Sequence, residues 1–158
     1  MKKTNAMRIL DRNKVNYEVR IYDISDDKID GMSVADKVGV AYGEVFKTLV
    51  TQGKKGHYVF VIEVNQKLDL KKAAETVGEK KIEMLSQRDL KQLTGYIHGG
   101  CSPVGMKKLF PTVINTDAEN LKQISVSAGT LGMQVVLNPL DLAKVTGAKF
   151  ADITFVED

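Results

Sequence analysis

The amino-acid sequence predicts an α+β fold, a mixed and largely antiparallel sheet flanked by helices. Strand-like and helix-like segments follow one another without the regular β-α-β-α order of a doubly wound sheet. Two β-rich runs, 45–51 and 57–64, are joined by Gly53-Lys54-Lys55-Gly56, which is typical of a hairpin. Because we find no internal repeat, linker or low-complexity tract, we expect one domain, residues 1–158.

The elements expected in the first third of the chain have recognisable starts or alternation. Thr4 can cap a first helix, and residues 17–22 alternate apolar and polar side chains like a half-buried strand. The acidic segment 23–31 is rich in turn formers, so it should be a flexible loop. Ser33 can then cap a short helix that ends at Gly39.

Similar signals place the remaining elements. Asp69 can cap an amphipathic helix that ends at Gly78, and Ser86 can cap the helix that follows it. Asn138-Pro139 is typical of a helix start, because proline is tolerated at the first helical position. Further strands are expected at 111–115, 123–127, 134–137 and 149–156.

The composition is typical of a soluble cytoplasmic protein. Hydrophobic residues make up 43% of the chain, and no segment approaches the ~20 apolar residues that cross a bilayer. Arg8, Asp11 and Arg12 interrupt the apolar run that a signal peptide would need. One cysteine excludes an internal disulfide and, with two distant histidines, makes a poor metal site, so we expect no metal or cofactor.

The glycine-rich stretch YIHGGCSPVG, residues 96–105, holds the chain's single cysteine. Its glycines and proline exclude a regular helix or strand, so its backbone N–H groups could form an oxyanion hole, although a tight turn without a ligand is an equally good interpretation. Cys101 and His98 would form a nucleophile and base only if they met in space, and a free cysteine is more often a small buried hydrophobe. Ser102 lacks the G-x-S-x-G context of a nucleophile, so its hydroxyl is better suited to fastening the turn.

Lys47 is the candidate for a charged group in a pocket. It shares a face of its predicted strand with Leu49, so its ammonium either reaches water at the rim or meets an anion or a polarised carbonyl. Tyr22 and Ser127 could line the same pocket, but packing and turn formation explain them equally well.

Several motifs together resemble the YbaK/EbsC family of aminoacyl-tRNA deacylases over nearly the whole chain. They are VFKTLV, LDLKKAAETVGEKKIEM, TGYIHGGCSPVGMKKLFPTVI, ISVSAG and LDLAKVTGAKFADI. The resemblance implies the fold of the editing insertion domain of prolyl-tRNA synthetase, in which the sheet closes towards a barrel. It also implies metal-free hydrolysis of cysteine mischarged onto proline-specific tRNA, with that tRNA and prolyl-tRNA synthetase as partners.

The resemblance also implies roles for individual residues. Lys47 would hold the aminoacyl-adenosine end, while the backbone of Gly99 and Gly100 would face the scissile carbonyl. Residues implied as further substrate contacts are Tyr22, Thr48, Ser102, Pro103, Gly105 and Ser127. The thiol of the bound cysteine would attack its own carbonyl, so no protein nucleophile is needed.

Three positions depart from the cysteine-specific pattern, which has an aromatic residue at Asp30, a glycine at Ala128 and an aspartate at Gln134. They leave open another small amino acid, or a binding module that has lost turnover. Among the lysine pairs, those at 54–55 and 107–108 are expected to meet the tRNA acceptor stem, although a solvated surface is the plainer interpretation of any one pair.

Overall fold

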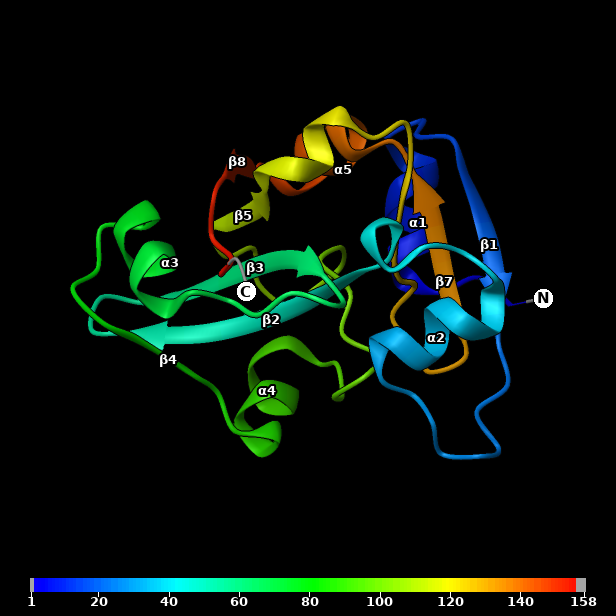
Figure 1. The fold of residues 1–158 in the computed structure, drawn as a ribbon, viewed down its shortest axis with the longest axis horizontal. Helices are drawn as coiled ribbons and strands as arrows, with labels where there is room; N and C mark the ends of the chain where they lie inside the picture. Colours follow the sequence, from blue (N-terminus) through cyan, green and yellow to red (C-terminus); the bar gives the residue numbers. More distant parts are fainter. Residues whose placement is uncertain (1, 156–158) are drawn as a thin grey trace.

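The computed structural model describes residues 2–155, and its helices are short (Figure 1). The α-helices are α1 Asn5–Arg12, α2 Gly31–Val38, α3 Leu70–Thr76, α4 Gln87–Thr94 and α5 Pro139–Thr146, and the 3-10 turns are η1 Tyr42–Glu44 and η2 Thr116–Asn120. The strands are β1 Tyr17–Ile21, β2 Phe46–Gly53, β3 His57–Glu63, β4 Ile82–Met84, β5 Thr112–Asn115, β6 Ile124–Ser127, β7 Met133–Leu137 and β8 Lys149–Ala151. No helix within residues 2–155 is long and apolar enough to span a membrane.

The strands form two open sheets. One has the order β1-β7-β6 and is antiparallel throughout, and the other has the order β4-β2-β3-β5-β8. In the second sheet β4, β2 and β3 run antiparallel, whereas β3, β5 and β8 run parallel. The prediction of a mixed, largely antiparallel α+β fold is therefore confirmed.

The expectation that the sheet closes towards a barrel is wrong for the part of the chain that the structure describes. Within residues 2–155, only one bridge, between Val45 and Ser125, links the two sheets. The residue before β2 touches β6 there, but no hydrogen-bonded ladder continues from it, so both sheets keep their edges. Figure 1 shows the β2–β3 hairpin running away from the small sheet, with α3 near its tip.

Capping side chains explain where α1 and α2 begin. Thr4 Oγ1 accepts the Met7 N–H at the start of α1, as predicted. The start of α2 differs from the prediction, because Asp30 is the cap and Ser33 is the residue it binds. Asp30 Oδ2 accepts the Ser33 N–H at 3.1 Å and Oδ1 accepts its hydroxyl at 2.6 Å, so the helix begins three residues earlier than predicted, at Gly31.

The last predicted strand is shorter than expected. β8 ends at Ala151 because Asn115 Oδ1 accepts the Ile153 N–H at 3.1 Å and turns the chain away from β5. Thr154 forms a separate bridge with Leu68, and Val156 lies outside the described residues.

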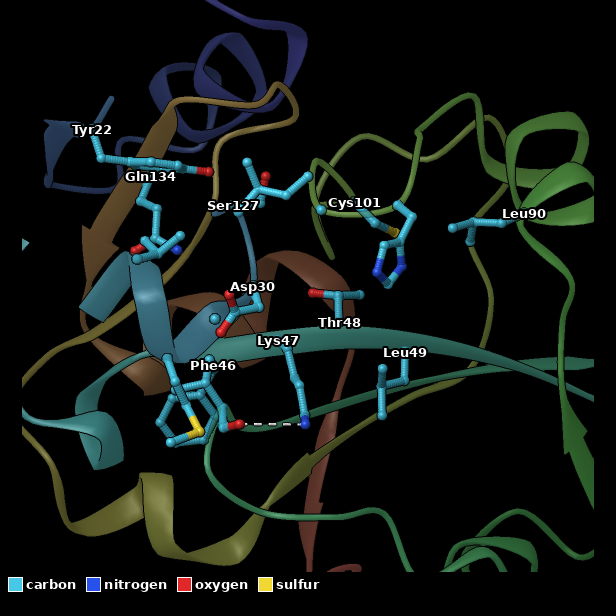
Figure 2. Close-up of a pocket in the computed structure, with 17 residues that line it drawn as sticks. Tyr22, Asp30, Phe46, Lys47, Thr48, Leu49, Leu90, Cys101, Ser127 and Gln134 are labelled. Atoms are coloured by element: carbon cyan, nitrogen blue, oxygen red, sulfur yellow. Dashed lines mark hydrogen bonds between the residues drawn. The ribbon is translucent and has the colours of Figure 1, made fainter. Parts of the chain in front are cut away.

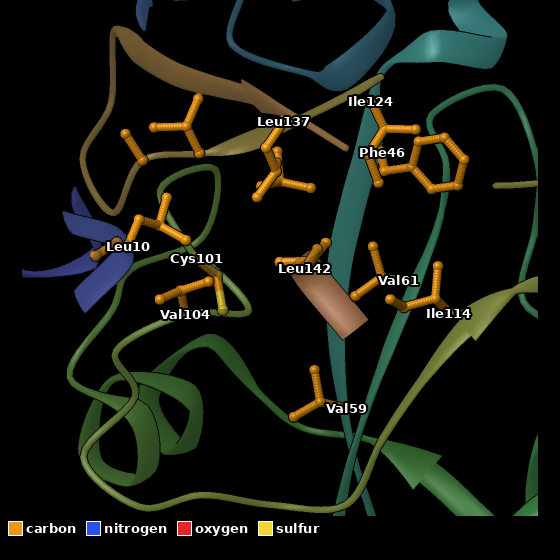
Figure 3. Close-up of a cluster of buried hydrophobic side chains, with 14 of the residues drawn as sticks. Leu10, Phe46, Val59, Val61, Cys101, Val104, Ile114, Ile124, Leu137 and Leu142 are labelled. Atoms are coloured by element: carbon orange, nitrogen blue, oxygen red, sulfur yellow. The ribbon is translucent and has the colours of Figure 1, made fainter. Parts of the chain in front are cut away.

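The main core lies between the two sheets and is closed by α1 and α5 (Figure 3). Leu10 of α1, Leu142 of α5 and Phe46 of β2 are nearly fully buried in it. A second cluster packs α3 on the five-stranded sheet through Ala73 and Phe60.

The small sheet turns one face to this core and a polar face away from it. Val135 and Leu137 of β7 lie in the core. Side chains alternate along a strand, so Gln134, which precedes Val135, points the opposite way. Gln134 pairs with Arg20 of β1 on one side and Ser127 of β6 on the other. This polar row forms one wall beside the start of β2.

Candidate active site

A pocket of about 430 Å³ opens where β2 begins, between the polar face of the small sheet, the start of α2 and the glycine-rich loop (Figure 2). Its lining residues are Tyr22, Ile29, Asp30, Gly31, Met32, Val34, Phe46, Lys47, Thr48, Leu49, Val64, Leu90, His98, Gly99, Cys101, Ser127 and Gln134. The pocket brings together Lys47, Thr48, Tyr22, Ser127 and Gly99, which the sequence singled out. In residues 2–155, no three His, Cys, Asp or Glu side chains gather in a way that could hold a metal ion.

Lys47 supplies an ammonium that is half-buried in the pocket. Its Nζ donates to the Val64 carbonyl at 3.4 Å, at the long end of hydrogen-bonding distance. Burial, and to a lesser extent the positive charge of Lys67, holds the pKa of Lys47 below its usual value. Figure 2 shows Lys47 and Thr48 leaving β2 on opposite sides, as strand alternation predicts.

The start of α2 lies directly against this acceptor. A methyl group added to Gly31 would overlap the side chain of Val64, so only glycine allows this approach of α2 to the end of β3.

Two pocket oxygens lack hydrogen-bond partners. Among the described residues, Thr48 Oγ1 and Gln134 Oε1 are the buried side-chain polar atoms with none, and both residues line this pocket. Gln134 is only 6% exposed. Because an unpaired buried polar group costs about 1–3 kcal/mol, these oxygens mark places where a ligand donor would be favoured.

Gln134 is one of the pocket residues that sequence reasoning did not place in the binding set. Its departure from the family pattern was visible, but its direction depends on the register of β7 with β1 and β6. Ser127, its neighbour across the sheet, uses Oγ to accept the Gly129 N–H at 3.1 Å. The Ser127 hydroxyl proton can still be donated into the pocket.

The glycine-rich loop presents Gly99 to the pocket but not Gly100. Gly99 has φ +86°, and a Cβ there would lie 3.0 Å from Leu131 Cδ2 and 3.2 Å from Ile29 Cδ1. Gly100 is buried and its N–H donates to the Ile97 carbonyl at 3.0 Å, so that N–H closes the turn.

Ser102, Pro103 and Gly105 belong to the same loop but are not among the residues that line the pocket. Ser102 is fully buried, and its Oγ accepts the Val104 N–H at 3.2 Å. Pro103 and Gly105 line a second cavity of about 170 Å³. Tyr96 braces this side of the loop by donating its hydroxyl to the Val104 carbonyl at 2.6 Å.

Cys101 lies at the boundary between the main core and the pocket, because it packs in the core and also lines the pocket. It is 7% exposed, and burial raises the pKa of its thiol to about 12. A thiol with this pKa is protonated at neutral pH and is a poor nucleophile. His98 also lines the pocket but is exposed.

Comparison with known proteins shows the family of the chain. The family model described as "Aminoacyl-tRNA editing domain" matches residues 31–145. The chain belongs to this family. The match covers Lys47, Gly99, Ser127 and Gln134, whereas Tyr22 precedes it.

Individual relatives extend the likeness of this editing domain beyond the matched region. It is 49% identical, over 98% of its length and 95% of the relative's, to "Putative Cys-tRNA(Pro)/Cys-tRNA(Cys) deacylase EbsC" of Enterococcus faecalis. It is 25% identical, over 72% of its length and 71% of the relative's, to "Multifunctional Ser/Thr-tRNA deacylase ProXp-y" of Escherichia coli K12. A solved structure, "Crystal structure of a putative trans-editing enzyme for prolyl tRNA synthetase", superposes with TM-score 0.84 at 26% identity, covering 98% of this chain and all of that one.

Two of the three departures from the cysteine-specific pattern face the pocket of the editing domain. Asp30 and Gln134 line it. Ala128 is fully buried instead, and its N–H donates to the Met133 carbonyl at 3.1 Å. The pocket wall therefore carries two of the three differences, and the core carries the third.

The lysine pairs of the editing domain lie at different distances from the pocket. Lys54 is at the hairpin tip, seven residues along β2 from Lys47, which corresponds to about 23 Å of strand. Lys107 donates to the Gln92 carbonyl on α4, the helix whose Leu90 lines the pocket. Lys107 therefore contacts a helix that borders the pocket, whereas Lys54 lies at the far end of the hairpin.

Proposed function

We propose that the editing domain, residues 1–158, is a trans-editing deacylase that hydrolyses mischarged Cys-tRNA(Pro) in the cytoplasm. Family membership and the 49% identical relative, named as a deacylase of cysteinyl-tRNA, support this proposal. The observation that carries it is one pocket lined both by Lys47, with its half-buried ammonium, and by Thr48 and Gln134, whose buried side-chain oxygens lack partners.

The aminoacyl end of a tRNA offers what these groups lack. Its α-ammonium has three N–H donors, which suit the unpartnered Thr48 Oγ1 and Gln134 Oε1. Lys47 gives up only a 3.4 Å contact with Val64 when its ammonium turns to oxygens of the terminal adenosine or the ester. Binding therefore replaces weak or missing hydrogen bonds with stronger ones.

Hydrolysis then needs little from the protein beyond position and charge. The cysteine sulfur bonds to its own carbonyl carbon, the ester C–O bond breaks, and the thiol proton passes to the ribose oxygen of the tRNA. Water opens the resulting thiolactone to free cysteine. Lys47 and the backbone at Gly99 stabilise the negative charge that develops on the carbonyl oxygen.

This mechanism assigns Cys101 no chemical step. Its buried, protonated thiol packs beside the pocket, while the reactive thiol arrives with the substrate. Alanine lacks such a thiol, so the same pocket would leave Ala-tRNA largely intact.

The partners of the proposed reaction are mischarged tRNA and prolyl-tRNA synthetase. Lys107 and Lys108 are exposed beside α4 and would contact acceptor-stem phosphates, so binding should weaken with salt. The similar structure described as trans-editing for prolyl-tRNA synthetase supports that synthetase as the source of tRNA selectivity.

A seryl ester is a second candidate substrate. The unpartnered oxygens of Thr48 and Gln134 could accept a side-chain hydroxyl, and one relative is named a Ser/Thr-tRNA deacylase. Hydrolysis of Cys-, Ser-, Ala- and Pro-charged tRNA by the purified protein separates the two. We expect the cysteinyl ester to be hydrolysed fastest. Faster loss of the seryl ester would favour the second candidate, and tRNA binding without any hydrolysis would leave only a binding module.

A further inference from the structure

Lys37, in the last turn of α2, donates hydrogen bonds to three oxygens of one surface segment. Its Nζ donates to the Asp23 carbonyl at 2.6 Å, to Asp26 Oδ1 at 2.8 Å and to the Lys28 carbonyl at 2.7 Å. An ammonium has three N–H donors, so each has a partner. The Lys37 side chain is only 19% exposed although every residue it binds is exposed.

The bound segment, residues 23–28, leads on both sides into the pocket. Tyr22 precedes it, Ile29 and Asp30 follow it, and all three line the pocket. Tyr22 donates its N–H to the Gly132 carbonyl at 2.9 Å, which fixes the first end. At the second end, Ile29 lies so close to Gly99 that a Cβ on that glycine would be 3.2 Å from Ile29 Cδ1.

Other hydrogen bonds of segment 23–28 hold it mainly to itself. Ser25 donates its hydroxyl to Asp23 Oδ2, and Lys28 donates its N–H to Asp26 Oδ1. Asp27 has φ +59°, a left-handed conformation that is unfavourable for a residue with a side chain. The three bonds from Lys37 therefore tie an otherwise exposed, locally strained turn to the body of the protein.

We infer that Lys37 is a positioning residue for amino-acid selection. It holds segment 23–28 so that Tyr22, Ile29 and Asp30 form the pocket wall that contacts the esterified amino acid. This inference rests on the proposed deacylase function. Its structural part, the tie between Lys37 and the segment, does not depend on activity.

The bond must be made by a cation to work in this way. Lys37 lowers the pKa of Asp26 through their hydrogen bond, so the Asp26 carboxylate stays charged at neutral pH. A side chain of similar length without the charge should release the segment. Because residues 23–28 are exposed and contribute nothing to the main core, release should not unfold the protein.

The test compares Lys37→Met, Lys37→Arg and the control Lys28→Met, which removes a lysine charge from the segment itself but leaves the Lys28 carbonyl in place. We measure KM and kcat for Cys-tRNA(Pro), the ratio of Cys-tRNA to Ser-tRNA hydrolysis, backbone hydrogen exchange over 23–30, and the melting temperature.

For Lys37→Met we expect KM to rise about 10-fold, the Cys-to-Ser ratio to fall and exchange over 23–30 to speed up, with a melting temperature within about 3 °C of wild type. Lys37→Arg should recover most of the KM because its fork of N–H donors can reach the same oxygens. Lys28→Met should match wild type.

Unchanged KM, selectivity and exchange in a folded Lys37→Met variant would overturn the inference. So would a loss of activity that follows the melting temperature and is not rescued by arginine. If wild type hydrolyses no ester, the proposed function fails, and faster exchange confined to 23–30 in Lys37→Met still supports the tie while unchanged exchange overturns it.

Discussion

Replacing Lys47 by methionine should remove activity while making the protein more stable. Methionine keeps the length and flexibility of the lysine stem, so packing beside Leu49 should change little. What disappears is the ammonium, which is half-buried and holds only the 3.4 Å bond to the Val64 carbonyl.

The sign of the stability change follows from the pKa of Lys47. Burial lowers this pKa in the folded state, so the unfolded chain holds the proton more tightly than the folded one. The protonated lysine therefore costs stability at neutral pH, and this cost shrinks as the pH rises through the folded-state pKa. Removing it should gain about 0.5–1 kcal/mol, or about 1–4 °C in melting temperature.

The loss of activity should be much larger than this gain. A positioned donor that stabilises a developing oxyanion is typically worth about 10²–10³ in rate. Thermal unfolding and single-turnover hydrolysis of Cys-tRNA(Pro) measure the two effects on the same samples. A less stable variant that retains near wild-type hydrolysis would refute both the burial argument and the role of Lys47.

Three further variants test the other pocket groups. Gln134→Leu should lower the rate of Cys-tRNA hydrolysis about 10-fold, because it removes the acceptor Gln134 Oε1. The control Gln123→Leu, at an exposed position, should leave the rate unchanged. Equal rates for the two variants would count against a role for Gln134 Oε1 as an acceptor. Cys101→Ala should keep the hydrolysis rate within about 3-fold while costing about 1 kcal/mol in denaturant unfolding, and abolished hydrolysis in a folded sample would restore the cysteine-hydrolase hypothesis. Gly99→Ala should cost about 1–2 kcal/mol and at least 10-fold in rate, because φ +86° and the nearby Leu131 disfavour a Cβ; normal activity would show that the loop tolerates one.

Local sequence signals predicted the elements well and their assembly less well. Thr4 and Gly39 act at the helix ends as expected, because caps depend on neighbouring residues. Ser33 was assigned the cap that Asp30 provides, since both residue types can cap a helix and only the backbone decides between them. The open sheets could not be foreseen, because strand pairing such as the Val45–Ser125 bridge joins residues far apart in the sequence.

The site shows the same division. Family motifs assigned Lys47 and Gly99 to one site, and both residues line the same pocket. The turn-fastening role predicted for the Ser102 hydroxyl is confirmed by its bond with the Val104 N–H, whereas only strand register shows that Gln134 turns its amide inwards. Lys37 carried no sequence signal, because its three acceptors are brought to it by the path of segment 23–28.

The central claim is that this pocket cleaves a cysteinyl ester on tRNA. The most direct measurement follows the loss of Cys-tRNA(Pro) against increasing concentrations of wild-type protein, with tRNA binding measured on the same preparation. The account predicts a hydrolysis rate that rises with protein concentration, saturates, and falls towards the spontaneous rate in Lys47→Met. Saturating tRNA binding with hydrolysis no faster than the spontaneous rate would contradict it.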